Sequence, residues 1–436
     1  MQGSTQEEVR IDVGQLKLGM YVSRLDRPWE DSPFTLQGMW MESVADIEKV
    51  QRCCRYVYVD KNLSDSLTDM DQETASGPPP PHVSGPIPVV GEPHSQRRMD
   101  DWTPPARDEQ GAPLPGAGGV IRYEDEASVT EELPDARIAV VNLEATVAFA
   151  METIAEKESI NLRAITEAVK ELVASILRNP DPAIGFAIGR KQDNYTLRHC
   201  VNMAIWCICL GRQLGLPRSD LALLGTGATL CDLGRAKLPH SLLGQPKKLS
   251  SWEIEVVREH VNFSLELLDE HVDVDPVIRR MVAQHHEHIN GSGYPNAVAG
   301  EDIDLYARIA RIIDTFEALI STGPHRRPIT VSRATKELYS LRDQQFQKDL
   351  VEAFISAIGI YPAGTSVQLS SREAGIVVAG ARRNHLKPVI WRLTDADGFQ
   401  LARPNAVNLA KDDQQRQIKR DFVDGELGFS ARAFFC

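Results

Sequence analysis

Seven side chains of the types that bind metal ions are spread over one stretch of this 436-residue chain. They are four histidines, two aspartates and one cysteine, and eight of the eleven histidines lie between residues 199 and 325. Neutral imidazoles and carboxylates are the usual protein ligands for iron, manganese, zinc and nickel, and a helical bundle can direct them at one centre. The sequence therefore predicts a metal centre. Its candidate ligands are His199, Cys231, Asp232, His260, His285, His286 and Asp314.

The surroundings of these candidates strengthen the prediction. Asp314 follows an apolar stretch in which an unpaired carboxylate would be costly, and Cys231 and Asp232 end another strongly apolar segment. A single histidine such as His260 is more often a core or surface residue than a ligand. Because all seven candidates fall within one predicted domain, a shared site is the better explanation.

The elements that must position these residues have helical periodicity. Apolar residues recur at helical spacing from Ala136 to about Ala357, and Ser250 with Glu253 forms a capping box that begins one of the helices. We predict an all-α domain over residues 136–358. The expected helices are 139–156, 161–177, 196–214, 220–232, 250–270, 277–287 and 305–320, followed by two more up to residue 358.

The flanking segments have other patterns. Residues 1–62 predict a small accessory or sensor domain, with strands near 9–13, 20–22 and 56–60 and a helix over 43–53. Eleven of the 26 prolines lie between residues 78 and 115, which predicts a flexible linker over residues 63–135. Residues 359–436 predict a β extension with strands at 366–369, 375–378 and 388–391.

Composition limits the classes of function. The net charge of 48 − 61 = −13 argues against a general DNA- or RNA-binding protein, although a local site can still bind a small anion. We find no run of about 18 apolar residues and no signal peptide, so we expect no transmembrane segment. Seven cysteines, an odd number, favour a reduced, cytoplasmic compartment without a disulfide framework.

Several motifs resemble one known family. Cys231-Asp232-Leu233-Gly234-Arg235 stands where the HD superfamily of metal-dependent phosphohydrolases has its His-Asp motif. His285-His286-Glu287, followed by Asn290-Gly291-Ser292-Gly293-Tyr294-Pro295, is similar to the HD-GYP subgroup. Residues 1–62 resemble the small N-terminal domain that often accompanies it in bacteria. The resemblance implies a mostly α fold, with an HD-type helical bundle, a small N-terminal α+β domain and a short C-terminal β appendage.

The resemblance also implies an activity. HD-GYP proteins open cyclic di-GMP to linear pGpG and then GMP with two divalent metal ions, which polarise the phosphodiester and supply a nucleophile. Iron or manganese is expected first, and zinc, nickel or magnesium are alternatives. By the resemblance, Asp232 bridges the metals, and His260, His285 and His286 complete one side. Asp314 and residue 231 serve the other side, and His199 aligns with a position that approaches the metals in some members.

The expected ligand contacts come from the same family pattern. Arg235, as a catalytic residue beside Asp232, and Arg326 would contact the phosphates of cyclic di-GMP. Gly293, Tyr294 and Pro295 form a tight turn that would shape the pocket or dock a diguanylate cyclase domain. A homodimer is compatible with the sequence.

Departures from the family motifs leave two functions open. Cys231 replaces a histidine and is either a thiolate ligand or a small buried apolar residue, and Arg235 replaces a lysine. The first hypothesis is an active cyclic di-GMP phosphodiesterase. The second is a catalytically degenerate module that binds cyclic di-GMP or a protein partner without hydrolysis. Other departures are Gln245, Asn290, Glu317, Gly323 and His325.

Overall fold

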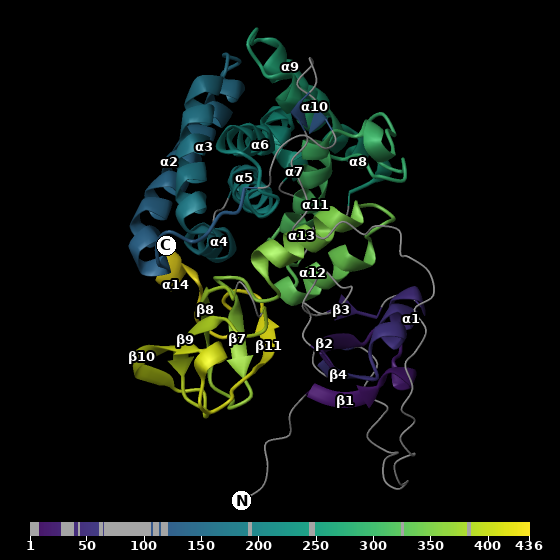
Figure 1. Cartoon of the computed structure of the whole chain (residues 1–436). Helices are drawn as coiled ribbons and strands as arrows, with labels where there is room; N and C mark the ends of the chain where they lie inside the picture. Colours follow the sequence, from purple (N-terminus) through teal and green to yellow (C-terminus); the bar gives the residue numbers. More distant parts are fainter. Residues whose placement is uncertain are drawn as a thin grey trace, which may run out of the picture. The chain divides into compact units, whose positions relative to one another are not determined.

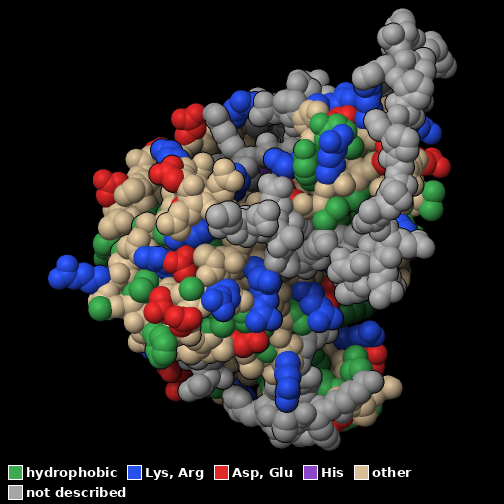
Figure 2. Space-filling view, turned by 90° about the horizontal axis from the view of Figure 1, so that it is seen from below, with side chains coloured by type: hydrophobic (Ala, Val, Ile, Leu, Met, Phe, Trp, Pro, Cys, Tyr) green, Lys and Arg blue, Asp and Glu red, His purple; other side chains and the backbone are tan. Residues whose placement is uncertain are grey.

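The computed structural model describes residues 8–27, 39–41, 44–60, 64, 106–107, 113–114, 121–190, 194–243, 249–323, 327–381 and 385–436. The chain divides into two compact units, Met1–Trp102 and Thr103–Cys436. Most of the predicted linker lies outside the described residues, and the predicted domain boundaries stay predictions. Figure 2 shows basic and acidic side chains interspersed among the described residues that are visible there.

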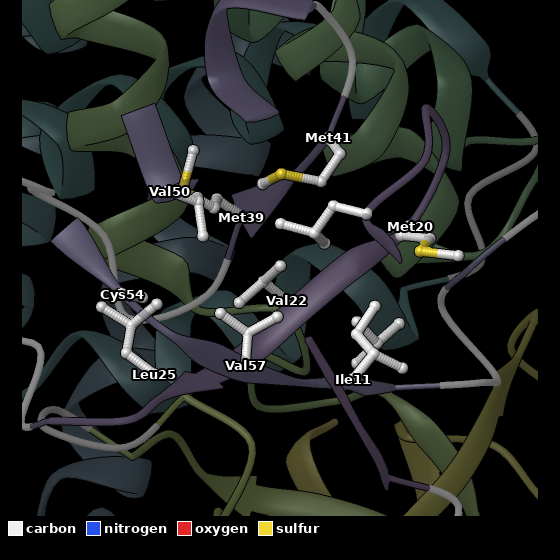
Figure 3. Close-up of a cluster of buried hydrophobic side chains, with 11 residues drawn as sticks. Ile11, Met20, Val22, Leu25, Met39, Met41, Val50, Cys54 and Val57 are labelled. Atoms are coloured by element: carbon white, nitrogen blue, oxygen red, sulfur yellow. The ribbon is translucent and has the colours of Figure 1, made fainter. Parts of the chain in front are cut away.

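The first unit contains a four-stranded antiparallel sheet in the order β1-β4-β2-β3. Its elements are β1 (Glu8–Asp12), β2 (Tyr21–Leu25), β3 (Met39–Trp40), α1 (Val44–Cys53) and β4 (Tyr56–Asp60). Apolar side chains from the strands and α1, among them Val22, Val50 and Val57, form its core (Figure 3). The predicted strands and helix of this region are confirmed within one or two residues at most ends.

The second unit is built mainly from helices, which confirms the predicted mostly helical fold class. Its helices are α2 (Val129–Ala155), α3 (Leu162–Arg178), α4 (Pro180–Gly189), α5 (Tyr195–Gln213), α6 (Arg218–Cys231), α7 (His240–Leu243), α8 (Ser251–Arg258), α9 (His260–Asp269), α10 (Pro276–Gln284), α11 (Leu305–Ile320), α12 (Val331–Ser340), α13 (Lys348–Ile358) and α14 (Arg432–Phe435). A two-stranded pair, β5 (Ala106–Arg107) with β6 (Pro113–Leu114), precedes them.

Helix α5 is the centre of the helical bundle (Figure 1). It packs against α2, α3, α4, α6, α11 and α13, and its residues 196–211 are all buried. A helix that is apolar on every side is stable only when neighbours cover it all round. Trp206 of α5 packs edge to face on Phe316 and Phe354, which joins α5 to α11 and α13. The polar residues that α5 does carry are therefore held in a dry interior.

Helix α2 begins ten residues earlier than predicted. Ser128 caps it and Glu131 completes a capping box, and Pro134 is accommodated inside the helix. Among the described residues, α2 is the one helix long and apolar enough, by length and composition, to cross a membrane. Its buried residues recur at helical spacing, as at Val140, Leu143 and Val147, and that side of α2 packs on α3, α4 and α5.

Helix α4 was not predicted, because its sequence contains two prolines and two glycines. Pro180 and Pro182 lie in the first turn, where backbone N–H groups have no partner within the helix and proline is tolerated. Gly185 is required by packing, since a Cβ there would lie 2.4 Å from the ring of Phe435 in α14. The C-terminal residues of the chain therefore rest directly on α4.

A five-stranded antiparallel sheet in the order β10-β9-β8-β7-β11 follows the helices. Its strands are β7 (Ser366–Leu369), β8 (Ala374–Ala379), β9 (Val389–Thr394), β10 (Gln400–Asn408) and β11 (Ile418–Phe422). The three predicted strands are confirmed as β7, β8 and β9. Strands β10 and β11 were missed because most of their residues are polar or exposed, so no alternating apolar pattern marks them.

Candidate metal centre

Three buried residues from three places in the bundle form the first half of the centre. His199 lies in α5, Asp232 follows the last residue of α6, and Asp314 lies in α11. His199 Nε2 is 3.1 Å from Asp232 Oδ2 and 3.3 Å from Asp314 Oδ1. Their ligand atoms all lie within 4.8 Å of one another, so they could hold one metal ion. We call them the three-ligand group.

Asp232 also belongs to a second group, with His260, His285 and His286, and we call these the four-ligand group. His260 is the first residue of α9, while His285 and His286 follow the last residue of α10. The Nε2 atom of His260 is 3.4 Å from that of His285 and 3.1 Å from that of His286. Because the helix ends at Gln284, the adjacent histidines can both face the centre, with ring centroids 4.0 Å apart.

Two glycines allow this close assembly. Gly234 follows Asp232 in a short 3₁₀ helix, and a Cβ there would lie 2.3 Å from the carbonyl oxygen of His260. Gly293 packs against the segment after His286, where a Cβ would lie 2.4 Å from the Glu287 Cα. A side chain at either position would force apart the segments that carry the histidines. Gly293, predicted as a substrate contact, thus has a clear packing role.

The three histidines of the four-ligand group are neutral and present lone pairs. His260 Nδ1 donates to the Val257 carbonyl at 2.6 Å and His285 Nδ1 donates to the Val282 carbonyl at 2.8 Å. Burial lowers the pKa of His260 to about 4 and also lowers the pKa of His285 and that of His286. With Nδ1 protonated, the Nε2 atoms of His260 and His285 are acceptors that face each other across 3.4 Å.

This arrangement fits a cation. Opposed lone pairs repel unless a positive charge lies between them, and buried neutral imidazoles are common metal ligands. Asp232 Oδ1 is fully buried and makes no hydrogen bond among the described residues, while Arg235 Nε lies 2.5 Å away as an ion pair. Burial would raise the pKa of Asp232, but Arg235 and His199 hold it well below its usual range, so the carboxylate is ionised.

The ring of His199 is held on its Nδ1 side by Glu317, which the sequence analysis noted only as a departure from the family motif, and by residues that it did not mark. Glu317 accepts a hydrogen bond from His199 Nδ1, and it also accepts from Asn202 at 3.2 Å and from Ser321. Tyr195 stacks on the His199 ring, with centroids 5.5 Å apart. Carboxylates that hold a metal-ligating histidine by its other nitrogen orient the ring and increase its basicity. The signal in the sequence was a glutamate three residues after Asp314.

Arginines pair with both aspartates. Besides the Arg235–Asp232 pair, Arg311 Nη1 lies 2.8 Å from Asp314 Oδ2. Burial would raise the pKa of Asp314, but His286, His199 and Arg311 hold it well below its usual range. Arg235 was predicted at the site, whereas Arg311 was missed. The sequence could have indicated Arg311, because a residue three positions before Asp314 lies on the same face of the helix.

The thiol of Cys231 takes part in neither ligand group of the described residues. Cys231 is fully buried, and burial together with the charge of Asp232 raises the pKa of its thiol well above the ordinary value. A protonated thiol is a poor metal ligand. Of the two interpretations of Cys231, this geometry fits the small buried apolar residue.

The remaining predicted contacts lie around the histidines. Tyr294 stacks on His286 with ring centroids 4.6 Å apart, and Arg258 Cζ lies 4.5 Å from the centroid of the Tyr294 ring. Pro295 follows Tyr294 in the same turn and is exposed. Arg326 lies outside the described residues, as do Gln245 and His325. The predicted turn therefore lies against the four-ligand group.

Two family models match successive parts of the chain. Residues 171–350 match the model of a family described as "HD domain". Residues 8–165 match a family described as a domain of unknown function, DUF3391. The HD match contains all seven predicted metal ligands. The second match extends past residue 62, into α3 of the helical bundle.

Curated relatives align with different shares of this chain. The protein named cyclic di-GMP phosphodiesterase PA4108, from Pseudomonas aeruginosa, is 28% identical over 87% of this chain and 83% of its own length. The protein named 3'3'-cGAMP-specific phosphodiesterase 2, from Vibrio cholerae, is 30% identical over 45% of this chain and 37% of its own. The response regulator RpfG of Xanthomonas campestris, named a cyclic di-GMP phosphodiesterase, is 34% identical over 34% of this chain and 39% of its own.

Among solved structures, Bd1817, a protein from Bdellovibrio bacteriovorus titled HDG"Y"P, aligns with 80% of this chain and 98% of its own. The TM-score is 0.38 and the sequence identity is 16%.

Proposed function

We propose that the protein is a metal-dependent phosphodiesterase that hydrolyses cyclic di-GMP to pGpG and GMP, a proposal supported by the match of residues 171–350 to the HD domain model. The observation that carries the proposal is the convergence of three neutral histidines and two ionised aspartates in one buried centre. That donor set suits two divalent cations, with iron or manganese expected first.

The side chains have separate tasks in this reaction. Asp232 offers one carboxylate oxygen to each ligand group, so it would bridge the two cations. Bound metal ions would polarise the phosphodiester and make a nucleophile available at neutral pH. Arg235, beside Asp232, would bind a nonbridging phosphate oxygen and offset negative charge as it develops. Tyr294, already stacked on His286, would bound the pocket for the nucleotide.

Cyclic di-GMP is the proposed substrate because a relative that aligns with 87% of this chain is named a cyclic di-GMP phosphodiesterase. Relatives named for 3'3'-cGAMP cover a smaller share of this chain. Both nucleotides are cyclic dinucleotides with two phosphodiesters, so the pocket around the metals must distinguish their bases.

A metal-resolved hydrolysis assay tests the proposal. Protein stripped of metal and reloaded anaerobically with Fe²⁺ or Mn²⁺ should convert cyclic di-GMP to pGpG or GMP, measured by chromatography. Parallel reactions with 3'3'-cGAMP compare the two substrates, and His285→Ala is the inactive control. Folded protein that hydrolyses neither nucleotide with any of Fe²⁺, Mn²⁺, Zn²⁺, Ni²⁺ or Mg²⁺ would contradict the proposal.

A second function, binding without hydrolysis, is favoured by two observations. The Cys231 thiol stands outside both ligand groups, and arginines already neutralise both aspartates in part. In this case the centre would bind cyclic di-GMP, or a diguanylate cyclase through the turn around Tyr294, without turnover. Calorimetry with metal-free protein distinguishes the two functions, because tight nucleotide binding that needs no metal supports the second. The cytoplasmic location and a homodimer stay predictions.

A further inference from the structure

The two ligand groups of the centre are unequal. The four-ligand group has three histidines and Asp232, whereas the three-ligand group has His199, Asp232 and Asp314. Protein metal sites usually supply three or four side chains, and each added ligand strengthens retention of the ion. The shared Asp232 contributes to both groups, so the difference arises from the other residues.

Charge compensation increases this difference. The oxygen Asp314 Oδ2 is in an ion pair with Arg311 at 2.8 Å, and His286 Nδ1 lies 3.3 Å away. A metal ion in the three-ligand group must therefore compete with an arginine for one of its two carboxylates. In the four-ligand group, a metal ion must also compete with Arg235 for Asp232. The three histidines of that group, however, have no cationic partner at their Nε2 atoms among the described contacts.

The side chain that could complete the three-ligand group does not do so. Cys231 directly precedes Asp232, yet its buried thiol is in neither group of the described residues. It lies instead at the end of α6, inside the core.

We infer that the centre binds its two metal ions with different affinities: the four-ligand group retains one ion, and the three-ligand group holds the second ion weakly. Changing a residue that only orients a ligand typically lowers metal affinity 10- to 100-fold, and a missing ligand should cost no less. The dissociation constant of the second ion should therefore exceed that of the first by at least about 10-fold.

Titration of metal-free protein with Mn²⁺, followed by calorimetry and by metal analysis after gel filtration, tests this inference. We expect one manganese per chain to survive gel filtration and a second to bind only in a weaker phase. His285→Ala should abolish the retained ion, whereas His199→Ala should abolish only the weaker phase. Cys231→Ala is the matched control and should change neither phase by more than about 2-fold, because the thiol is not a ligand.

Cys231→His tests the same inference by adding a ligand to the three-ligand group instead of removing one. A histidine at the end of α6 should strengthen the weaker phase toward the affinity of the first. If that larger side chain prevents folding, the His199→Ala and His285→Ala titrations still decide the question.

Three outcomes would overturn the inference: two ions retained equally in the wild type, loss of the tight phase in His199→Ala, or weakened binding in Cys231→Ala. The inference rests on the proposed metal centre but not on turnover. One retained ion without hydrolysis would support it and contradict the proposed activity. Two equally retained ions together with hydrolysis would contradict the inference and support the proposed activity.

Discussion

At the scale of single residues, Asp232 has the largest number of roles. It is fully buried, belongs to both ligand groups and pairs with Arg235. We predict that Asp232→Ala abolishes metal retention and lowers turnover by several orders of magnitude, because both cations lose a ligand and the phosphate loses its alignment. The metal-free protein should still fold but melt at a lower temperature, because the loss of the buried partner of Arg235 outweighs the relief of repulsion between Asp232 and Asp314.

Asp304 provides the matched control for this prediction. It is another buried aspartate, which caps α11 and pairs with Arg280 away from the ligand groups. Asp304→Ala should lower stability by about 1 kcal/mol, as expected for a lost helix cap, but leave metal content unchanged. Metal analysis, thermal unfolding and hydrolysis measured on both variants separate the two effects. Unchanged hydrolysis in Asp232→Ala would refute the assignment of the centre.

Glu317 gives a second prediction at this scale. Its carboxylate accepts from His199 Nδ1, so it holds the ring with Nε2 toward Asp232 and Asp314, the orientation in which Nε2 would bind a metal ion. We predict that Glu317→Gln weakens the second, looser manganese phase about 10- to 100-fold and leaves the tight phase unchanged. Calorimetric titration measures both phases, and kcat should fall more than KM rises. Equal weakening of both phases would indicate a general structural defect instead.

The candidate ligands could be predicted from residue type and from the family motif, but their partners could not. Six of the seven candidates meet in the two groups, whereas Cys231 does not. Which atoms converge depends on where α8, α9 and α10 end, and the sequence predicted one unbroken helix over residues 250–270. The observed break at Glu259 begins α9 at His260, whose ring bonds to the Val257 carbonyl.

At the scale of elements, close packing between α4 and α14 leads to a third prediction. A Cβ at Gly185 would lie 2.4 Å from the Phe435 ring, and Phe435 is fully buried. Gly185→Ala should therefore destabilise the protein by about 1–3 kcal/mol through overpacking. Phe435→Ala should cost about 3–5 kcal/mol through the cavity that it leaves.

A variant with both substitutions tests whether the stability losses of Gly185→Ala and Phe435→Ala both arise from the contact between these two positions. Once Phe435 is truncated, the methyl group of Gly185→Ala has room, so the double variant should be more stable than the sum of the single changes predicts. Denaturant unfolding of the four proteins measures this coupling. Additive free energies would show that the Gly185→Ala cost arises from the α4 backbone rather than from contact with Phe435.

The elements that were predicted correctly are those with a clear apolar period. Helix α11 buries apolar residues at helical spacing, and strands β7 and β8 are short, largely buried apolar runs, so both patterns are visible in the sequence. Helix α4 was hidden by residues that normally end helices, and its glycines are explained only by contact with the distant residues of α14. Strand β10 is mostly exposed, so its pairing with β9 depends on backbone hydrogen bonds that leave no trace in hydropathy.

At the scale of the whole molecule, the two compact units should respond differently to metal. All the ligands lie in the second unit, and the sheet of the first unit has its own apolar core (Figure 3). A ligand stabilises the cooperative unit that binds it, by about 2.7 kcal/mol when its concentration is 100 times the dissociation constant. We predict that Mn²⁺ slows hydrogen exchange in peptides from α5, α6 and α9 to α11, and leaves peptides from β1, β2 and β4 unchanged.

Exchange followed by mass spectrometry on the intact chain, with and without Mn²⁺, measures both sets of peptides in one experiment. Asp232→Ala is the control, because it should show the metal-free pattern under both conditions. Slower exchange in β1, β2 or β4 on addition of Mn²⁺ would contradict the prediction and show that metal binding stabilises the first unit as well. In that case the sheet would be energetically coupled to the centre.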